Sequence, residues 1–516
     1  MYFMNFIFTS ECMLMNRILY CLLWLFVAII GLTNCLRDEL VFTSDPNARL
    51  EFSVDTLRFD TVFTELGSAT RLFKVYNRNN RAVRITQISL ESGNAARWRM
   101  NVDGIPGNRQ TEVEILPKDS IYVFVEVTID PDQPLSVSPF VIEDRIRFET
   151  NGNEQYVHLE AWGQNANYFP SRFNRGVAVT LSCNGGRIIW DDPKPYVIYG
   201  AVFVEACELV IPAGARVYVH GGVARNDLFG GVYNDGILYI LESGKLTIQG
   251  TKNQPVILQG DRLEANFQNS AGQWNGLIIG RGSRGNVIEY ATIRNSRFGV
   301  LVDSLGELTA RNAKFYNTSS SGIIGFKSRI TAENCLVYNN GATSVLFLLG
   351  GDYDFTYCTI ASYGVNASAL GMSNFYCYNS DCSDFREHPL QARFRNSIIF
   401  GSRNDELELA DSRSGQEPAL FNINFENCVV RVQQLLTQSG GRYARFLEEQ
   451  CNPCRNGSRT DRLFFDVSKT DFRLDSLSIA HGIAKPILFP RAIDIDIEGN
   501  LRSTASPDAG CYERLD

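Results

Sequence analysis

The chain has 516 residues, 44% of them hydrophobic and 21% charged, which excludes a disordered protein and leaves room for several domains. With 49 Lys and Arg against 57 Asp and Glu, the net charge is −8 and disfavours nucleic-acid partners, which are bound by clustered cations. Only four His and 13 Cys are present, so we expect neither a metal nor another cofactor, and no disulfide scaffold. Abundant Phe, Tyr and Gly favour many short strands joined by turns.

The first 35 residues are predicted to form an export signal. Residues 18–32 are a run of 15 apolar residues, shorter than a membrane-spanning helix requires. A single-pass membrane anchor is the alternative interpretation. The segment Leu32-Thr33-Asn34-Cys35 resembles the lipobox of bacterial lipoproteins, although Asn34 replaces the usual small residue. The resemblance implies that Cys35 is lipidated and that this lipid attaches the mature chain to a membrane.

Residues 36–45 are predicted to form a polar tether between the lipid and the folded chain. Its start, Leu36-Arg37-Asp38-Glu39, resembles the signal that sends some Gram-negative lipoproteins to the outer leaflet of the outer membrane. The expected location is therefore the cell envelope, with a lipid anchor in the outer membrane. Exposure to the periplasm and exposure at the cell surface both stay open.

Residues 46–165 alternate apolar and polar residues in strand-length segments, as in RLFKVYN (71–77) and VRITQISL (83–90). Clusters of Asn, Gly, Pro and Asp separate these segments, which indicates antiparallel strands with one buried face. The pattern is similar to the bacterial relatives of the abnormal-spindle/Hydin domains, and this implies an immunoglobulin-like β-sandwich. The sandwich is either a spacer or a protein-binding module. His158 lies in one of its strands and is expected to be structural.

Residues 170–516 contain a repeat in which a small residue follows Asn or Tyr and an apolar residue stands two positions further on. The first four copies begin 22, 22 and 23 residues apart, too close for helix-pair repeats, and they lack the frame of leucine-rich repeats. This spacing predicts a parallel β-solenoid with stacked coils. The copies are IEYATI (288–293), ARNAKF (310–315), AENCLV (332–337), FTYCTI (355–360), FRNSII (394–399) and FENCVV (425–430).

Stacking of coils assigns a place to each repeated residue. The small residue of each copy is expected to point inward, which makes Cys335, Cys358 and Cys428 buried small hydrophobes rather than reactive thiols. The preceding Asn residues, among them Asn312 and Asn334, are expected to hydrogen-bond from coil to coil at a turn.

The tail DIEGNLRSTASPDAGCYE (496–513) and the repeats together resemble right-handed parallel β-helix repeat lipoproteins of Gram-negative bacteria, which have a pectin-lyase-like fold. The resemblance implies that residues 170–516 form one right-handed parallel β-helix. It also implies contact with carbohydrate, because proteins of this class often bind or cleave acidic polysaccharides. The predicted fold class is all-β, an immunoglobulin-like β-sandwich followed by a right-handed parallel β-helix.

The sequence assigns no catalytic residue. The polygalacturonase elements Gly-His-Gly and Arg-x-Lys are absent, as is the pectate-lyase element Arg-x-Pro-x-x-Arg. Asp261, Arg262, Trp274 and Asp352 are the candidate glycan-binding residues, because carboxylate, guanidinium and aromatic groups suit a sugar where loops of neighbouring coils meet. The alternative is that both Asp residues cap turns and that Trp274 closes a coil. His388 is expected to lie in a loop.

Two pairs of nearby cysteines, Cys377 with Cys382 and Cys451 with Cys454, are predicted to form local disulfides, since an exported protein meets an oxidising environment. For the second pair, a redox-active dithiol or half of a zinc site is the alternative. No second Cys or His pair stands at zinc spacing in the sequence, and we therefore expect no metal site.

These observations predict a non-enzymatic cell-envelope lipoprotein that presents its β-helix at the cell surface for binding of a polysaccharide or an envelope protein. The alternative is an enzyme, namely a polysaccharide lyase or a glycoside hydrolase acting on acidic polysaccharide. An open groove with at least two carboxylates and a Lys or Arg on one lateral face of the β-helix would favour the enzyme.

Overall fold

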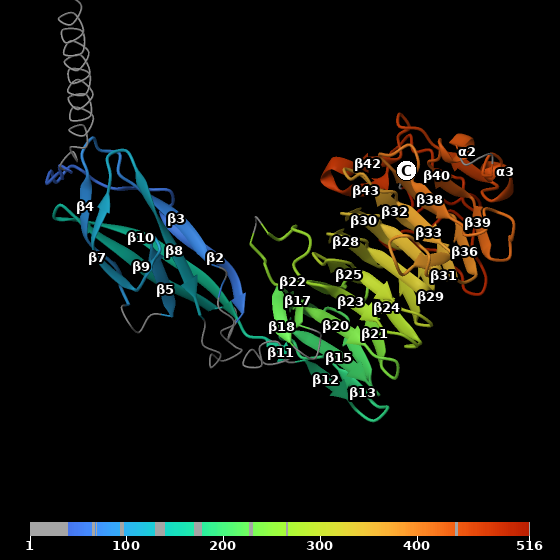
Figure 1. The fold of residues 1–516 in the computed structure, drawn as a ribbon, viewed down its shortest axis with the longest axis horizontal. Coiled ribbons are helices and arrows are strands. Elements are labelled where there is room, and N and C mark those ends of the chain that lie inside the picture. The colour runs from blue at the N-terminus through green and yellow to red at the C-terminus, as the bar shows by residue number, and fades with distance from the viewer. Residues whose placement is uncertain are drawn as a thin grey trace, which may run out of the picture. The chain divides into compact units, whose positions relative to one another are not determined.

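The computed structural model describes residues 40–63, 68, 70–92, 97–128, 140–169, 178–226, 231–264, 267–438 and 442–514 (Figure 1). These residues form two compact units, the first within residues 40–160 and the second mainly within residues 161–514. Cys35 and the rest of the predicted export signal lie outside the described residues. In the described part of the chain, no helix is long and apolar enough to cross a bilayer.

Two five-stranded sheets make up the first unit, and aromatic side chains fill the space between them. The ring of Phe73 on one sheet meets Phe148 on the other edge-on, with ring centroids 6.3 Å apart, and both are buried. The predicted β-sandwich is confirmed, and its kinship with the abnormal-spindle/Hydin domains stays a prediction. In order across each sheet, the strands are β1 (Glu51–Phe52), β3 (Arg71–Tyr76), β8 (Ser120–Val127), β5 (Trp98–Val102) and β6 (Ile105–Pro106), then β2 (Thr56–Phe63), β10 (Asn153–Gln164), β9 (Phe140–Thr150), β4 (Val83–Leu90) and β7 (Arg109–Ile115).

An 11-stranded parallel sheet runs the length of the second unit. Its apolar side chains face inward and pack against a second, larger sheet, with Val217, Leu258 and Ile293 fully buried in successive coils. Its strands, in spatial order, are β11 (Asn167–Phe169), β14 (Tyr196–Tyr199), β17 (Arg216–His220), β22 (Val256–Gly260), β25 (Ala291–Arg294), β28 (Lys314–Thr318), β30 (Leu336–Asn340), β32 (Thr359–Ser362), β37 (Ile398–Gly401), β40 (Cys428–Val430) and β41 (Cys454–Asn456).

The larger sheet has 16 strands in two parallel rows, which merge because strands β29 and β31 are long enough to belong to both. The first row is β12 (Val179–Ser182), β15 (Ala201–Glu205), β20 (Ile237–Ile240), β23 (Gly276–Ile279), β26 (Val300–Val302), β29 (Ile323–Glu333), β31 (Val345–Thr356), β33 (Leu370–Ser373) and β38 (Leu407–Ala410). The second row adds β13 (Arg187–Ile189), β16 (Glu208–Pro212), β21 (Lys245–Gln249), β24 (Asn286–Glu289), β27 (Glu307–Arg311), β36 (Leu390–Arg395) and β39 (Phe421–Glu426).

Each coil thus contributes a strand to the first row, a strand to the second row and a strand to the 11-stranded sheet, as in β20, β21 and β22 (Figure 1). The predicted fold class, a β-sandwich followed by a parallel β-helix, is confirmed. Smaller elements project from the coils or follow them: β18 (Val223–Asn226), β19 (Gly231–Asn234), β34 (Phe375–Cys377), β35 (Phe385–Glu387), α2 (Leu435–Gln438), α3 (Phe446–Glu449), β42 (Phe464–Asp466), a 3₁₀ turn (Val467–Lys469) and β43 (Asp471–Leu474).

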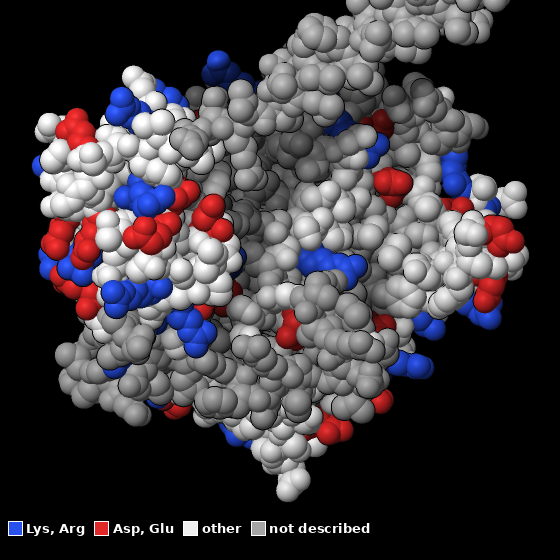
Figure 2. Space-filling view, turned by 60° about the vertical axis from the view of Figure 1, so that its left-hand side comes forward, with Lys and Arg blue, Asp and Glu red and all other residues white. Residues whose placement is uncertain are grey.

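Charged side chains alternate in sign along the outer surface of the second row. Glu307, Arg329 and Asp352 lie in register on successive strands, and Arg329 reaches both carboxylates, at 3.6 and 3.1 Å. Mixed charge is also visible elsewhere, because basic and acidic side chains are interspersed over the face drawn in Figure 2. The negative net charge is therefore not gathered into one patch on that face.

The repeated residues occupy equivalent places in the coils. The small residue of each copy is buried, and Cys335, Cys358 and Cys428 are fully so. Burial raises the pKa of the Cys428 thiol to about 12, which keeps it protonated and unreactive. The residue before each small one has a left-handed backbone, with φ between 44° and 54°, a conformation that suits Asn; these are Tyr290, Asn312, Asn334, Tyr357, Asn396 and Asn427. Asn334 donates to the Oδ1 of Asn312 at 3.1 Å, as predicted.

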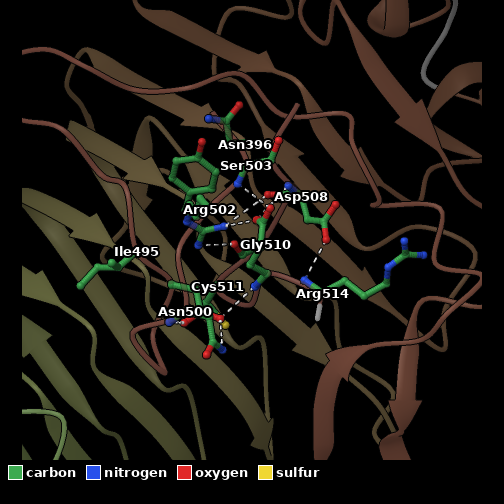
Figure 3. Close-up of polar contacts among 12 residues, drawn as sticks. Asn396, Ile495, Asn500, Arg502, Ser503, Asp508, Gly510, Cys511 and Arg514 are labelled. Carbon is green, nitrogen blue, oxygen red and sulfur yellow. Dashed lines mark hydrogen bonds and ion pairs between the residues drawn. The ribbon is translucent and has the colours of Figure 1, made fainter. Parts of the chain in front are cut away.

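The chain that follows β41 packs on the outer face of the 11-stranded sheet and builds a second hydrophobic core there. Tyr338 and Phe400 of the sheet pack in this core with Phe472 of β43 and Tyr512 of the tail (496–513). The polar contacts of this region centre on Arg502, shown in Figure 3. Its guanidinium lies over the ring of Tyr357 at 3.8 Å and donates to Asn334 Oδ1 at 2.9 Å. Arg502 therefore attaches the tail (496–513) to Asn334, one of the stacked turn residues that precede the small residues of the repeat.

Candidate functional site

Polar side chains gather at one corner of the early coils, where strands of the 11-stranded sheet end and strands of the first row begin. His220 is the last residue of β17, Asp261 follows β22, and Asp235 and Gln273 shortly precede β20 and β23. The chain can turn this tightly because glycines stand at the close approaches: a Cβ at Gly221 would lie 1.8 Å from the carbonyl oxygen of Gln273. We call His220, Asp235, Asp261, Arg262 and Gln273 the corner site.

An imidazole–carboxylate pair forms the exposed part of the corner site. The Nδ1 of His220 lies 2.7 Å from Oδ2 of Asp261, and the ring of Tyr199 stacks on the imidazole with ring centroids 4.4 Å apart. Burial lowers the pKa of His220, but the hydrogen bond and the charge of Asp261 outweigh it and leave the pKa raised. The His220 side chain is 40% exposed, so its other ring nitrogen can meet a ligand.

Two buried oxygen atoms beside this pair have no hydrogen-bond partner among the described residues, namely Oδ1 of Asp235 and Oε1 of Gln273. Asp235 is only 8% exposed, and burial raises the pKa of its carboxyl although the N–H of Gly236 opposes this. The amide nitrogen of Gln273 is already used, since it donates to the carbonyl oxygens of Phe267 and Ser270. Buried polar atoms without partners are rare in folded proteins, which makes these two oxygens candidate ligand contacts.

Arg262 completes the corner site on its outer side. Its Nε lies 3.0 Å from Oε1 of Glu264, and its guanidinium covers one face of the Phe267 ring at 4.1 Å. Phe267 is 44% exposed, so an aromatic surface and a guanidinium lie together beside the His220–Asp261 pair. Carboxylates, an amide, an imidazole, a guanidinium and aromatic rings are the groups that bind sugar hydroxyls and the apolar faces of sugar rings.

The four predicted glycan-binding residues do not all meet. Asp261 and Arg262 lie at the corner site. Trp274 is next to it but 2% exposed, and its indole N–H donates to the carbonyl oxygen of Arg294 at 2.9 Å, so it belongs to the core. Asp352 lies on a later coil, in the second-row part of β31, where it pairs with Arg329 at 3.1 Å. The sequence interpretation missed His220 and Asp235, whose only local signals are the turn sequences His-Gly-Gly and Asn-Asp-Gly.

Three disulfides occur among the described residues. Cys377 is joined to Cys382 and Cys451 to Cys454. A third disulfide, between Cys183 and Cys207, was not predicted; it links β12 to β16 across 24 residues, close to the length of one coil. The repeat spacing extended towards the N-terminus is the signal that could have found it. No group of His, Cys, Asp and Glu in the described ranges is arranged to hold a metal ion.

No protein-family model and no curated protein matches the chain. Among solved structures, it is similar to the catalytic unit of a thermostable GH87 α-1,3-glucanase from Streptomyces thermodiastaticus strain HF3-3, with 10% identity, 69% of this chain and 72% of that chain covered, and a TM-score of 0.24. The Agl-KA catalytic domain gives 10% identity, coverage of 70% and 75%, and a TM-score of 0.22. A family 123 glycoside hydrolase from Clostridium perfringens gives 7% identity, coverage of 28% and 44%, and a TM-score of 0.16. At these TM-scores the likenesses assign no activity to the chain.

Proposed function

We propose that the protein is a lipid-anchored protein of the cell envelope whose β-helix binds a glycan through the corner site. The observation that carries this proposal is the pair of buried oxygens, Asp235 Oδ1 and Gln273 Oε1, left without partners next to the exposed His220. Sugar hydroxyls would donate to these oxygens and satisfy them. The stacked ring of Tyr199 would fix the imidazole that meets the same ligand.

Binding of the full-length chain to polygalacturonate and to neutral hexasaccharides, measured by calorimetry, tests this proposal. Asp261→Asn removes the charge that orients His220, and we expect it to weaken binding about tenfold or more, because hydrogen bonds to charged groups contribute about 1.5–3 kcal/mol. Asp352→Asn is the matched control, since Asp352 lies on a later coil outside the corner site and its substitution should leave affinity unchanged. The proposal would be overturned if Asp261→Asn bound every glycan that the wild type binds, with the same affinity as the wild type.

One observation favours glycoside hydrolysis at the same corner as a second candidate function. Asp235 has a raised pKa and lies close enough to act on the pKa of His220, which is paired with Asp261. Glycosidases place two carboxyl groups beside the bond that they cleave, one as the acid and one as the base or nucleophile. New reducing ends formed by the wild-type chain and lost in Asp235→Asn would establish this function. Glycan binding without product formation would instead support the first proposal, a glycan-binding protein.

A further inference from the structure

A short hairpin projects from the later coils and exposes several aromatic rings. It comprises β34 and β35 between strands β33 and β36, and the Cys377–Cys382 disulfide closes its loop. Tyr376, Tyr378 and Phe385 are 36%, 55% and 42% exposed. We call these three residues the aromatic hairpin. None of them belongs to the corner site, which lies on earlier coils.

The rings of the aromatic hairpin are held in defined orientations. Tyr376 meets Tyr378 at a centroid distance of 5.2 Å and an angle of 77°. On its other side, Tyr376 meets Phe326 of β29 at 5.2 Å and 79°. Phe385 is oriented by Phe375, with ring centroids 6.4 Å apart at 89°. Edge-to-face contacts of this kind orient the rings and leave faces of the exposed rings open to a ligand.

The base of the hairpin is fixed to the β-helix by polar contacts. The backbone N–H of Phe375 donates to Ser373 Oγ at 3.1 Å, and the N–H of His388 donates to the carbonyl oxygen of Asn374 at 2.8 Å. Glu387 forms an ion pair with Arg413 and accepts a hydrogen bond from Ser412. Together with the disulfide, these contacts order the rings before any ligand arrives, which lowers the entropy cost of binding.

Polar groups surround the exposed rings. Asp381 accepts from the N–H and the hydroxyl of Ser383, and these hydrogen bonds lower the pKa of its carboxyl, so it is ionised at neutral pH. Asp384 pairs with Arg386 at 2.7 Å. The phenol oxygens of Tyr376 and Tyr378 have no hydrogen-bond partner in the described part of the chain. Open ring faces, phenol oxygens and carboxylates are therefore presented on one rigid hairpin.

We propose that the aromatic hairpin is a second glycan-binding site, for neutral sugar rings. Pyranose rings present apolar C–H faces that stack on aromatic rings, while their hydroxyls reach carboxylates and phenols. Segment 375–388 contains no Leu, Ile, Val or Met, so the hairpin lacks the aliphatic surface with which a protein partner would pack. Two exposed Asp carboxylates against one Arg disfavour acidic sugars by like-charge repulsion.

The test measures calorimetric binding of the full-length chain to cellohexaose, maltohexaose and mannohexaose, with tetragalacturonate as the acidic comparison. We expect at least one neutral probe to bind, and Tyr378→Ala to weaken its binding about tenfold or more. Tyr378→Phe keeps the ring and should retain most of the affinity. Tyr122→Ala is the control, because Tyr122 is an exposed tyrosine of the sandwich, outside the hairpin.

Each alternative to neutral-sugar binding predicts a different outcome of this binding experiment. The proposal is overturned if the wild type binds no neutral probe. It is also overturned if Tyr378→Ala binds the neutral probe with the same affinity as the wild type. Tighter binding of tetragalacturonate than of the neutral probes, lost in Tyr378→Ala, overturns the assignment to neutral sugars. The Asp261→Asn variant alters the corner site and leaves the hairpin unchanged, so failure of one site is distinguishable from failure of the other.

Discussion

Glu406 illustrates what a single buried residue does in this fold. It is fully buried at the start of β38, and its two carboxylate oxygens accept the backbone N–H groups of Arg403 and Ala369, at 2.7 and 2.9 Å. Burial outweighs these hydrogen bonds and raises the pKa of the carboxyl to about 7. The sequence alone does not single out Glu406, because burial of one side chain depends on which coils stack above and below it.

The raised pKa of Glu406 predicts a pH dependence of stability. Between about pH 4.5 and 7, the folded chain binds a proton that the unfolded chain has released, so the free energy of unfolding falls as pH rises through this window. The decrease from this group is about 1.4 kcal/mol per pH unit at most. Glu406→Gln should flatten the dependence measured by urea unfolding from pH 5 to 8. Glu417→Gln, at an exposed position, should keep the wild-type slope, and a steep slope in both variants would contradict the assignment.

The C-terminal tail (496–513) is an element whose contacts only the structure shows. Its sequence resembles the ending of a β-helix family, and in the structure its acidic residues form local hydrogen bonds. Asp496 accepts the backbone N–H groups of Glu498 and Asn500, and Asp508 accepts that of Gly482, so these acids order the tail itself. Arg502 donates a hydrogen bond to Asn334, one of the stacked turn residues, which is 168 residues away in sequence.

Removal of the Arg502 side chain should loosen the tail. Arg502 and Glu513 form an ion pair at 3.3 Å with side-chain exposures of 2% and 8%, so Arg502→Met leaves a buried carboxyl without its cation. We expect the free energy of unfolding to fall by about 3–5 kcal/mol. The double variant Arg502→Met/Glu513→Gln should recover part of this loss, because no charge is then left unpaired. Equal stability of the single and double variants would show that the pair is not coupled.

At the scale of the whole molecule, the proposed arrangement is a lipid, a tether, a sandwich and a β-helix in chain order. Cys35→Ala should move the full-length chain from the membrane fraction to the soluble fraction, because the lipid supplies the attachment. Fractionation followed by immunoblotting measures this, with Cys335→Ala as the control at a buried cysteine of the β-helix. Membrane association of Cys35→Ala equal to that of the wild type would contradict lipid anchoring and favour a single-pass anchor.

The sequence by itself determined the fold class, the repeat spacing, and which repeated residues point inward or stand at a turn. It could do so because each coil repeats the same local choices: a residue with left-handed backbone, a small inward residue and alternating apolar positions. The tertiary structure alone decided the corner site, since His220 ends one coil while Asp235 and Asp261 flank the next coil, and the three meet only after stacking. It also decided that Trp274 belongs to the core and that Asp352 lies on a later coil, outside the corner site. A periodic pattern determines the face to which each side chain points. Which side chains then meet at a site depends on the lengths of the irregular turns between the strands.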